Sequence, residues 1–328
     1  MEKIIVDFRA EEAGKNCLYS AIRNVLNYEG LKITEAEVFF AFGGLDLRYH
    51  PEQCYYGISD IIGNIKKYIV PWISVESGSA ANYKETVLDL SKQLDQKKPV
   101  VCIIQVGKLS YLDAPEEIKS PRRHTCVLYG LNEEKDKAYI ADTYRVDRLG
   151  NITVFMGEIS LRELMAALQG YFTLSCLLNT DSLPIQGIFR EALTDFLHPL
   201  TKKNCITGYS AFLEYLNQLK NYDADKKLYQ QKCFEAGYLI KVTTIQPYLD
   251  YFTEILPILS GCEKSHLYQL VKELEEIKTM WDDFRVKLIR DSFRDKEKRD
   301  KSLFSFSETI MKRQKEIFQD ISTACSGS

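Results

Sequence analysis

The sequence predicts an α+β fold in its first half and an all-α fold in its second half. Residues 99–178 contain several short apolar runs, whereas residues 17–42 show a helical spacing of apolar side chains. The composition changes at a linker over residues 179–187, and nearly every segment beyond it has the helical period. We therefore expect one domain at residues 1–180 and a helical domain at residues 186–328.

The first helices are predicted from apolar stripes and capping residues. Residues 17–29 carry apolar side chains at positions 18, 21, 22, 25 and 26, and Gly30 follows as a stop signal. Thr34 and Glu37 form a capping box at the start of a second helix over residues 34–42. Two further amphipathic helices are expected at residues 58–68 and 83–96.

Short apolar runs then predict a sheet. PVVCIIQV, residues 99–106, is typical of a buried strand. The runs at residues 124–132 and 138–144 flank the polar turn NEEKDK, so they should form a hairpin. Two more strands, at residues 151–157 and 171–178, are expected on either side of a helix over residues 160–169.

The second half is predicted to be a helical bundle, because long stretches repeat apolar residues with a helical period. The expected helices cover residues 187–198, 208–221, 225–240, 245–260, 264–293 and 302–322.

Charge and cysteine usage narrow the function. The formal net charge is −3, which gives no reason to expect nucleic acid or an anionic membrane as a partner. The N-terminus lacks the pattern of a secretory signal, and no apolar run is long enough for a membrane span, so we expect a cytoplasmic protein. The nine cysteines include no CxxC pair, and no metal site is expected.

Cys17 differs from the other cysteines because it stands at the first turn of a predicted helix. Backbone N–H groups there have no intrahelical acceptor, and the helix dipole favours an anion. Both effects favour a thiolate, and the same N–H groups can hold a developing oxyanion. The sequence therefore indicates a nucleophile at Cys17.

A base for this thiol is predicted on the hairpin. His124, one of four histidines, begins a strand that follows a loop, where its side chain can project into a cleft. Asp142 lies on the next strand and can neighbour His124 across the ladder. An aspartate in that position would orient the imidazole and stabilise its protonated form.

Two stretches resemble the N-terminal domain of the butirosin biosynthesis protein H family. They are KNCLYSAIRNVLNYEGLKITEAEVFFAFGG, which contains Cys17, and RRHTCVLYGLNEEKDKAYIADTY, which contains His124 and Asp142. The resemblance extends over roughly residues 10–178. It implies a papain-like cysteine-protease fold, with a helical half and an antiparallel sheet.

The resemblance also implies an acyltransferase that makes an amide during antibiotic or nonribosomal peptide assembly. An acyl or peptidyl chain would pass from the phosphopantetheine arm of a carrier protein to Cys17, and then to a small amine. His124 would move the protons and Asp142 would orient His124. No tightly bound cofactor is implied.

The chain departs from this pattern at the oxyanion hole. Papain-like enzymes commonly place a glutamine about six residues before the cysteine, where this chain has Glu11. A carboxylate cannot donate a hydrogen bond unless it is protonated. The hole would then rest on the Cys17 N–H group and a second donor, for which Asn16 is the candidate.

Two other segments are candidates for substrate binding. Residues 43–57 could line an acyl channel through Tyr49 and His50, or form an ordinary surface loop, and His50 is a reserve base. Arg122 and Arg123 precede His124 and could meet a phosphopantetheine phosphate or an acidic carrier helix, although the sequence favours a solvated basic pair.

Two alternative functions use the same residues. A hydrolase, either a peptidase or a thioesterase, would deliver water instead of an amine to the acylated cysteine. A non-catalytic binding protein on a cysteine-protease scaffold would show no preferential reactivity of Cys17 toward iodoacetamide.

Overall fold

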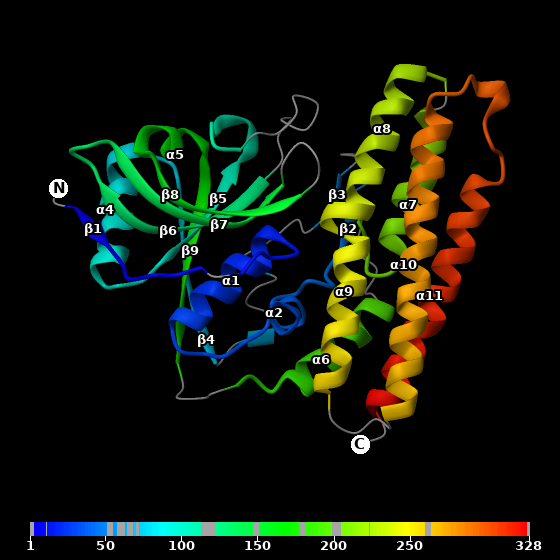
Figure 1. Cartoon of the computed structure of the whole chain (residues 1–328), viewed down its shortest axis with the longest axis horizontal. Coiled ribbons are helices and arrows are strands. Elements are labelled where there is room, and N and C mark those ends of the chain that lie inside the picture. The colour runs from blue at the N-terminus through cyan, green and yellow to red at the C-terminus, as the bar shows by residue number, and fades with distance from the viewer. Residues whose placement is uncertain are drawn as a thin grey trace. The chain divides into compact units, whose positions relative to one another are not determined.

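The computed structural model describes most of the chain and divides it into two compact units. The first unit comprises Met1–Val38 and Ile69–Leu183, and the second comprises Phe39–Tyr68 and Pro184–Ser328 (Figure 1). The residues described are 3–326 without 11, 51–54, 58–62, 64–67, 70–71, 113–122, 147–150, 178–181, 199–204, 223 and 260–263.

The first unit is built on a seven-stranded antiparallel sheet with the strand order β4-β9-β5-β6-β7-β8, in which β1 also pairs with β6. These strands are β1 (Ile4–Ile5), β4 (Ile73–Ser79), β5 (Val100–Gln105), β6 (Arg123–Asn132), β7 (Lys137–Val146), β8 (Ile152–Ser160) and β9 (Leu168–Cys176). Strands β6 and β7 form the hairpin predicted from the sequence, and β5 pairs with β6 on its other side.

Helix α1 (Cys17–Tyr28) packs on one side of this sheet, and α4 (Tyr83–Asp95) and α5 (Leu161–Ala167) lie on the other side (Figure 1). The apolar stripe of α1 is buried against β6 and β7, with Ile22, Val25 and Leu26 fully inaccessible to solvent. Burial of this stripe fixes the rotation of α1, and therefore the direction in which its first residue points.

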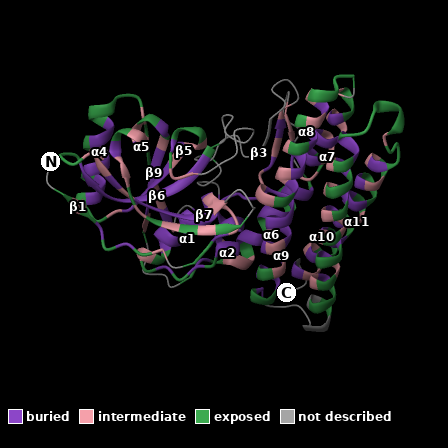
Figure 2. Cartoon of the chain, turned by 45° about the horizontal axis from the view of Figure 1, so that its top comes forward, coloured by how far each residue is buried: buried purple, intermediate pink, exposed green. Residues whose placement is uncertain are grey.

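The second unit is mainly helical. Its helices are α6 (Ile185–Leu197), α7 (Ser210–Gln218), α8 (Lys226–Tyr238), α9 (Ile245–Ile255), α10 (Lys264–Ser292) and α11 (Leu303–Ser326). Buried and exposed residues alternate along α10 and α11, as expected for helices with one face in a core (Figure 2). Trp281 is fully buried in that core, and its indole N–H donates to Gln314 at 2.7 Å.

A small sheet completes the second unit. It has the order β10-β2-β3, from β10 (Ile206–Thr207), β2 (Arg48–His50) and β3 (Tyr55–Gly57). The predicted all-α second half therefore needs a correction, because it contains the strand β10, which pairs with a segment about 150 residues earlier.

The observed division differs from the predicted domains at residues 39–68, which belong to the second unit. Helix α2 (Glu35–Ala41) crosses the division, and its phenylalanines join the aromatic core of the second unit. The Phe39 ring stacks on Tyr251 with centroids 4.6 Å apart, and the Phe40 ring packs edge-on against Phe252 at 5.0 Å. The sequence does not reveal these contacts, because the partners lie more than 200 residues away.

The structure confirms the predicted α+β class with a helical C-terminal region. Most of the expected helix at residues 58–68 lies outside the described residues. Among the helices whose residues are described, none combines the length and the apolarity that crossing a membrane requires.

Candidate active site

Cys17 is the first residue of α1 and is half-buried. The helix begins here because Asn16 is an extended N-cap residue whose Oδ1 accepts the N–H of Leu18 at 2.9 Å. The N–H of Ser20 returns to the Asn16 carbonyl at 3.0 Å, which closes the first turn. The thiol therefore sits where a helix end favours negative charge, as predicted.

A buried carboxylate anchors the loop that leads into Cys17. Glu35, at the start of α2, accepts the backbone N–H groups of Lys15 and Asn16, both at 2.9 Å. Glu35 and Arg23 are each less than a tenth exposed, and the guanidinium lies 3.5 Å from the Glu35 carboxylate. Arg23 also donates to the Glu12 carbonyl at 3.0 Å, so the loop is held at several points.

The loop is also tied to the strand that carries Asp142. The Gly14 N–H donates to the Thr143 carbonyl at 2.8 Å, and the Asn24 side chain donates to the Thr143 hydroxyl at 3.3 Å. Gly14 is required here, because an added Cβ would lie 2.3 Å from Ser20 Cβ. The sequence analysis missed these anchors, although Arg23 and Asn24 stand out as polar residues in the middle of an otherwise apolar helix.

His124 and Asp142 meet on the face of the sheet that α1 covers. The β6–β7 register pairs Val127 with Ala141, and its continuation places Asp142 diagonally from His124. His124 Nε2 lies 2.7 Å from Asp142 Oδ2, and both side chains are buried. The Cys17 side chain lies close enough to the same imidazole to act on its charge.

The surroundings of His124 favour its charged form. Burial alone would lower the pKa of His124, but the Asp142 carboxylate and the Cys17 sulfur outweigh burial and hold the pKa well above its usual value. A protonated imidazole between a sulfur and a carboxylate can stabilise a thiolate and then return a proton to a leaving group.

Tyr111 joins Cys17, His124 and Asp142 in one cluster, and it was not predicted from the sequence. Its hydroxyl donates to Asp142 Oδ2 at 3.0 Å, the oxygen that also contacts His124. The other oxygen, Oδ1, accepts the Tyr144 backbone N–H at 3.0 Å. Burial, followed by the nearby Asp142 charge, raises the pKa of Tyr111 well above its usual value, so the phenol remains a donor. No local pattern marks this tyrosine, because it follows β5 in a loop.

The remaining candidates lie in different places. The Asn16 side-chain oxygen is engaged in capping, which leaves its amide nitrogen as the atom for the predicted oxyanion role. Arg123 is exposed at the first position of β6, and Arg122 lies outside the described residues. Cys126, two residues after His124, is fully buried in the core of the sheet.

Tyr49 and His50 lie on β2 in the second unit. Tyr49 is buried against Tyr215, with ring centroids 5.9 Å apart. His50 Nε2 lies 3.6 Å from Cys205 Sγ. Their predicted role in an acyl channel stays a prediction.

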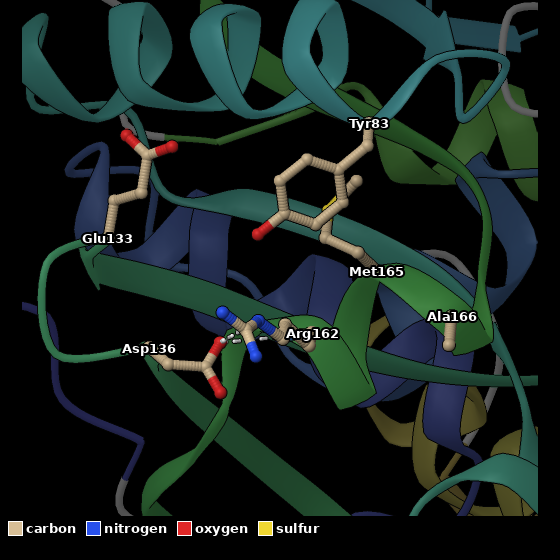
Figure 3. Close-up of a pocket in the computed structure, with 6 residues that line it drawn as sticks. All are labelled: Tyr83, Glu133, Asp136, Arg162, Met165 and Ala166. Carbon is tan, nitrogen blue, oxygen red and sulfur yellow. Dashed lines mark hydrogen bonds and ion pairs between the residues drawn. The ribbon is translucent and has the colours of Figure 1, made fainter.

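A separate open cavity of about 620 Å³ lies at the turn of the β6–β7 hairpin, the end of the hairpin opposite to His124 (Figure 3). Arg162 and Asp136 form an ion pair at its wall, with Nε and Oδ1 3.9 Å apart. Its lining residues are Tyr83, Glu133, Asp136, Arg162, Met165 and Ala166. None of them belongs to the Cys17 cluster, so this cavity has no part in the chemistry considered below.

Residues 16–143 match the family described as butirosin biosynthesis protein H, N-terminal. The matched segment begins just before Cys17 and ends just after Asp142, so it spans the whole cluster. This match confirms, for the matched segment, the resemblance found in the sequence. No curated protein matches the chain.

Proposed function

We propose that the chain is a biosynthetic acyltransferase that forms an amide through an acylated Cys17. The observation that carries this proposal is the position of His124, whose ring contacts the Asp142 carboxylate and lies near enough to Cys17 to respond to its charge. A helical segment that carries the cysteine and a sheet that carries the base are also what a papain-like fold would supply. The family match supports a role in antibiotic assembly of the butirosin type.

In the first half-reaction, the Cys17 thiolate attacks the carbonyl carbon of a carrier-bound thioester. The tetrahedral intermediate collapses by breaking the bond to the pantetheine sulfur, which takes a proton from the His124 imidazolium. The products are an acylated Cys17 and the thiol of the carrier. The Cys17 N–H group at the start of α1 is the first candidate to stabilise the oxyanion.

In the second half-reaction, an amine nitrogen attacks the Cys17 thioester. Neutral His124 accepts a proton from the amine, the carbon–sulfur bond breaks, and the thiolate and imidazolium are restored. Asp142 keeps the ring oriented through both steps, and its charge stabilises the imidazolium. Arg123 and Arg122 remain proposed contacts for the phosphopantetheine phosphate.

The test is intact-mass analysis of the chain after incubation with acetyl and hexanoyl thioesters, offered on N-acetylcysteamine and on acyl carrier proteins. One acyl group is expected per chain, located at Cys17 by peptide mapping. Cys17→Ala should abolish the adduct, whereas Cys205→Ala should retain it. Acylation spread over several cysteines, or unchanged in Cys17→Ala, would contradict the proposal.

Adding a primary amine to the acylated chain separates transfer from hydrolysis. An acyltransferase releases the amide, whereas a thioesterase or peptidase releases the acid at the same rate with or without the amine. A chain that never becomes acylated, and whose Cys17 is no more reactive than its other thiols, would fit the non-catalytic alternative.

A further inference from the structure

Tyr111 is held beside the acidic member of the cluster by contacts on several sides. Its segment follows the short helix η2 (Val106–Lys108), and the Lys108 ammonium donates to the Ala166 carbonyl of α5 at 3.1 Å. The Ser110 N–H donates to the Glu163 carboxylate on the same helix. The Tyr111 ring stacks on Phe155 of β8, with centroids 4.7 Å apart and planes 21° from parallel.

These contacts direct the Tyr111 hydroxyl toward one oxygen of the Asp142 carboxylate. Phe155 is the β8 partner of Asp142 in the sheet register, so a ring stacked on Phe155 lies next to the aspartate. The hydroxyl reaches Asp142 Oδ2 at 3.0 Å, while His124 Nε2 approaches the same atom at 2.7 Å. Two donors therefore share a single carboxylate oxygen in a buried site.

We propose that Tyr111 is a positioning residue that fixes the Asp142 carboxylate and moderates its hold on the His124 proton. This inference rests on the proposed function, because it acts through the same histidine. A hydroxyl that donates to Oδ2 withdraws charge from the oxygen that faces the imidazolium. Without it, the carboxylate would bind that proton more tightly and return it less readily to a leaving group.

The ionisable groups around His124 come from several elements. In the part of the chain that the structure describes, they are Cys17 on α1, Cys102 on β5, Cys126 on β6, Asp142 on β7 and Tyr111 after η2. The Cys126 pKa is raised well above its usual value, first by its hydrogen bond with Cys102 and then by burial, so this thiol stays neutral. The charges that respond to Tyr111 are therefore those of Cys17, His124 and Asp142.

The experiment measures the pH dependence of Cys17 carboxymethylation by iodoacetate, with the rate read at the Cys17 peptide. This anionic reagent reacts faster while the imidazole is protonated, so the alkaline limb reports the loss of the His124 proton. In Tyr111→Phe we expect this limb to move upward by about one pH unit, the size of one hydrogen bond to a charged group.

Tyr171→Phe is the matched control. Its hydroxyl donates to Asp89 Oδ2 at 2.6 Å in the same unit, outside the cluster. Its limb should coincide with that of the wild type. If Tyr111→Phe does not fold, Phe155→Ala serves instead, because it removes the stacking ring and keeps the hydroxyl. A smaller shift in the same direction is expected.

The outcomes separate the two proposals. In one outcome, the wild type shows the alkaline limb of His124, but in Tyr111→Phe this limb stays in place or moves to lower pH. That result overturns the role of Tyr111 and leaves the acyltransferase proposal intact. A wild-type Cys17 that reacts no faster than the other thiols, with no such limb, overturns both.

Discussion

Among the described residues, two cysteine–histidine pairs differ in their setting. Cys17 begins a twelve-residue helix and lies near His124, whose ring contacts an aspartate. Cys205 lies beside the two-residue strand β10, with its sulfur 3.6 Å from His50 Nε2 and 3.8 Å from the Ile206 carbonyl. A helix end stabilises an anion, whereas a carbonyl oxygen next to a sulfur opposes one.

A sulfur near an imidazole is not by itself enough to make a nucleophile, because the surroundings also decide whether a thiolate is stable. The Cys17 pair has a helix end, a buried carboxylate and a loop anchored by Glu35. The Cys205 pair provides an internal reference for reactivity, since both thiols are half-buried and each lies near a histidine. Each prediction below tests one of the features that separate the two pairs.

The largest effect on the reactivity of Cys17 is expected from substitutions of the histidines. His124→Gln should slow the reaction of Cys17 with iodoacetamide at pH 7 by about 10²-fold, because the thiolate loses its imidazolium partner. His50→Gln should leave the Cys17 rate within about twofold of the wild type. Peptide mass spectrometry measures both thiols in one sample. If Cys17 lost the same reactivity in both variants, His124 would have no special role in its reactivity.

Substitution of Asp142 should have the next largest effect on the reactivity of Cys17. Asp142→Asn removes the charge that favours the imidazolium, and we expect Cys17 alkylation to fall by at least about tenfold. Asp89→Asn alters the carboxylate that accepts from Tyr171 and is the matched control. An Asp142→Asn variant that reacts like the control would show that the carboxylate contributes nothing to the first pair.

Glu35 tests the anchored loop. Glu35→Gln leaves Arg23 without its buried counter-charge and weakens the acceptor of two backbone N–H groups, so unfolding should cost about 3 kcal/mol less. Glu37→Gln lies two residues away, is half-exposed, and keeps a residue type that completes a capping box, so its change should stay within about 0.5 kcal/mol. Denaturant titration of both variants measures the difference.

The smallest effect concerns the pH dependence of stability. Because the folded-state pKa of His124 is raised, its contribution is fully present below about pH 6.5, the unfolded value, and is lost as the pH rises through the folded value. The melting temperature of the wild type should exceed that of His124→Gln by a few degrees in mild acid. This difference in melting temperature should shrink at alkaline pH. A difference that grows there would contradict the ion pair between His124 and Asp142.

Local chemistry explains why the main residues of the candidate site could be proposed from the sequence. A cysteine at a helix start and a hairpin with a histidine and an aspartate are both visible in short windows of sequence. Glu35 and Tyr111 act on the site from a neighbouring helix and a loop, so only the tertiary fold reveals them.

The missed strands have a similar explanation. Strand β4, ISVESGS, lies at the edge of the sheet and exposes Glu76 and Ser77, so it lacks the apolar alternation that signals a strand. Strands β2, β3 and β10 span two or three residues each and exist only through pairing. Short windows of sequence carry too little pattern to predict such strands.

The crossing of α2 between the units has a consequence for how this chain can be recombined. A cut at the interdomain linker would leave Phe39, Phe40 and β2 attached to the N-terminal fragment. The helical fragment would lose part of its aromatic core and the partner of β10. The C-terminal helices therefore cannot be exchanged between proteins as one continuous segment. A chimera that preserves both halves has to carry residues 39–68 along with the C-terminal helices.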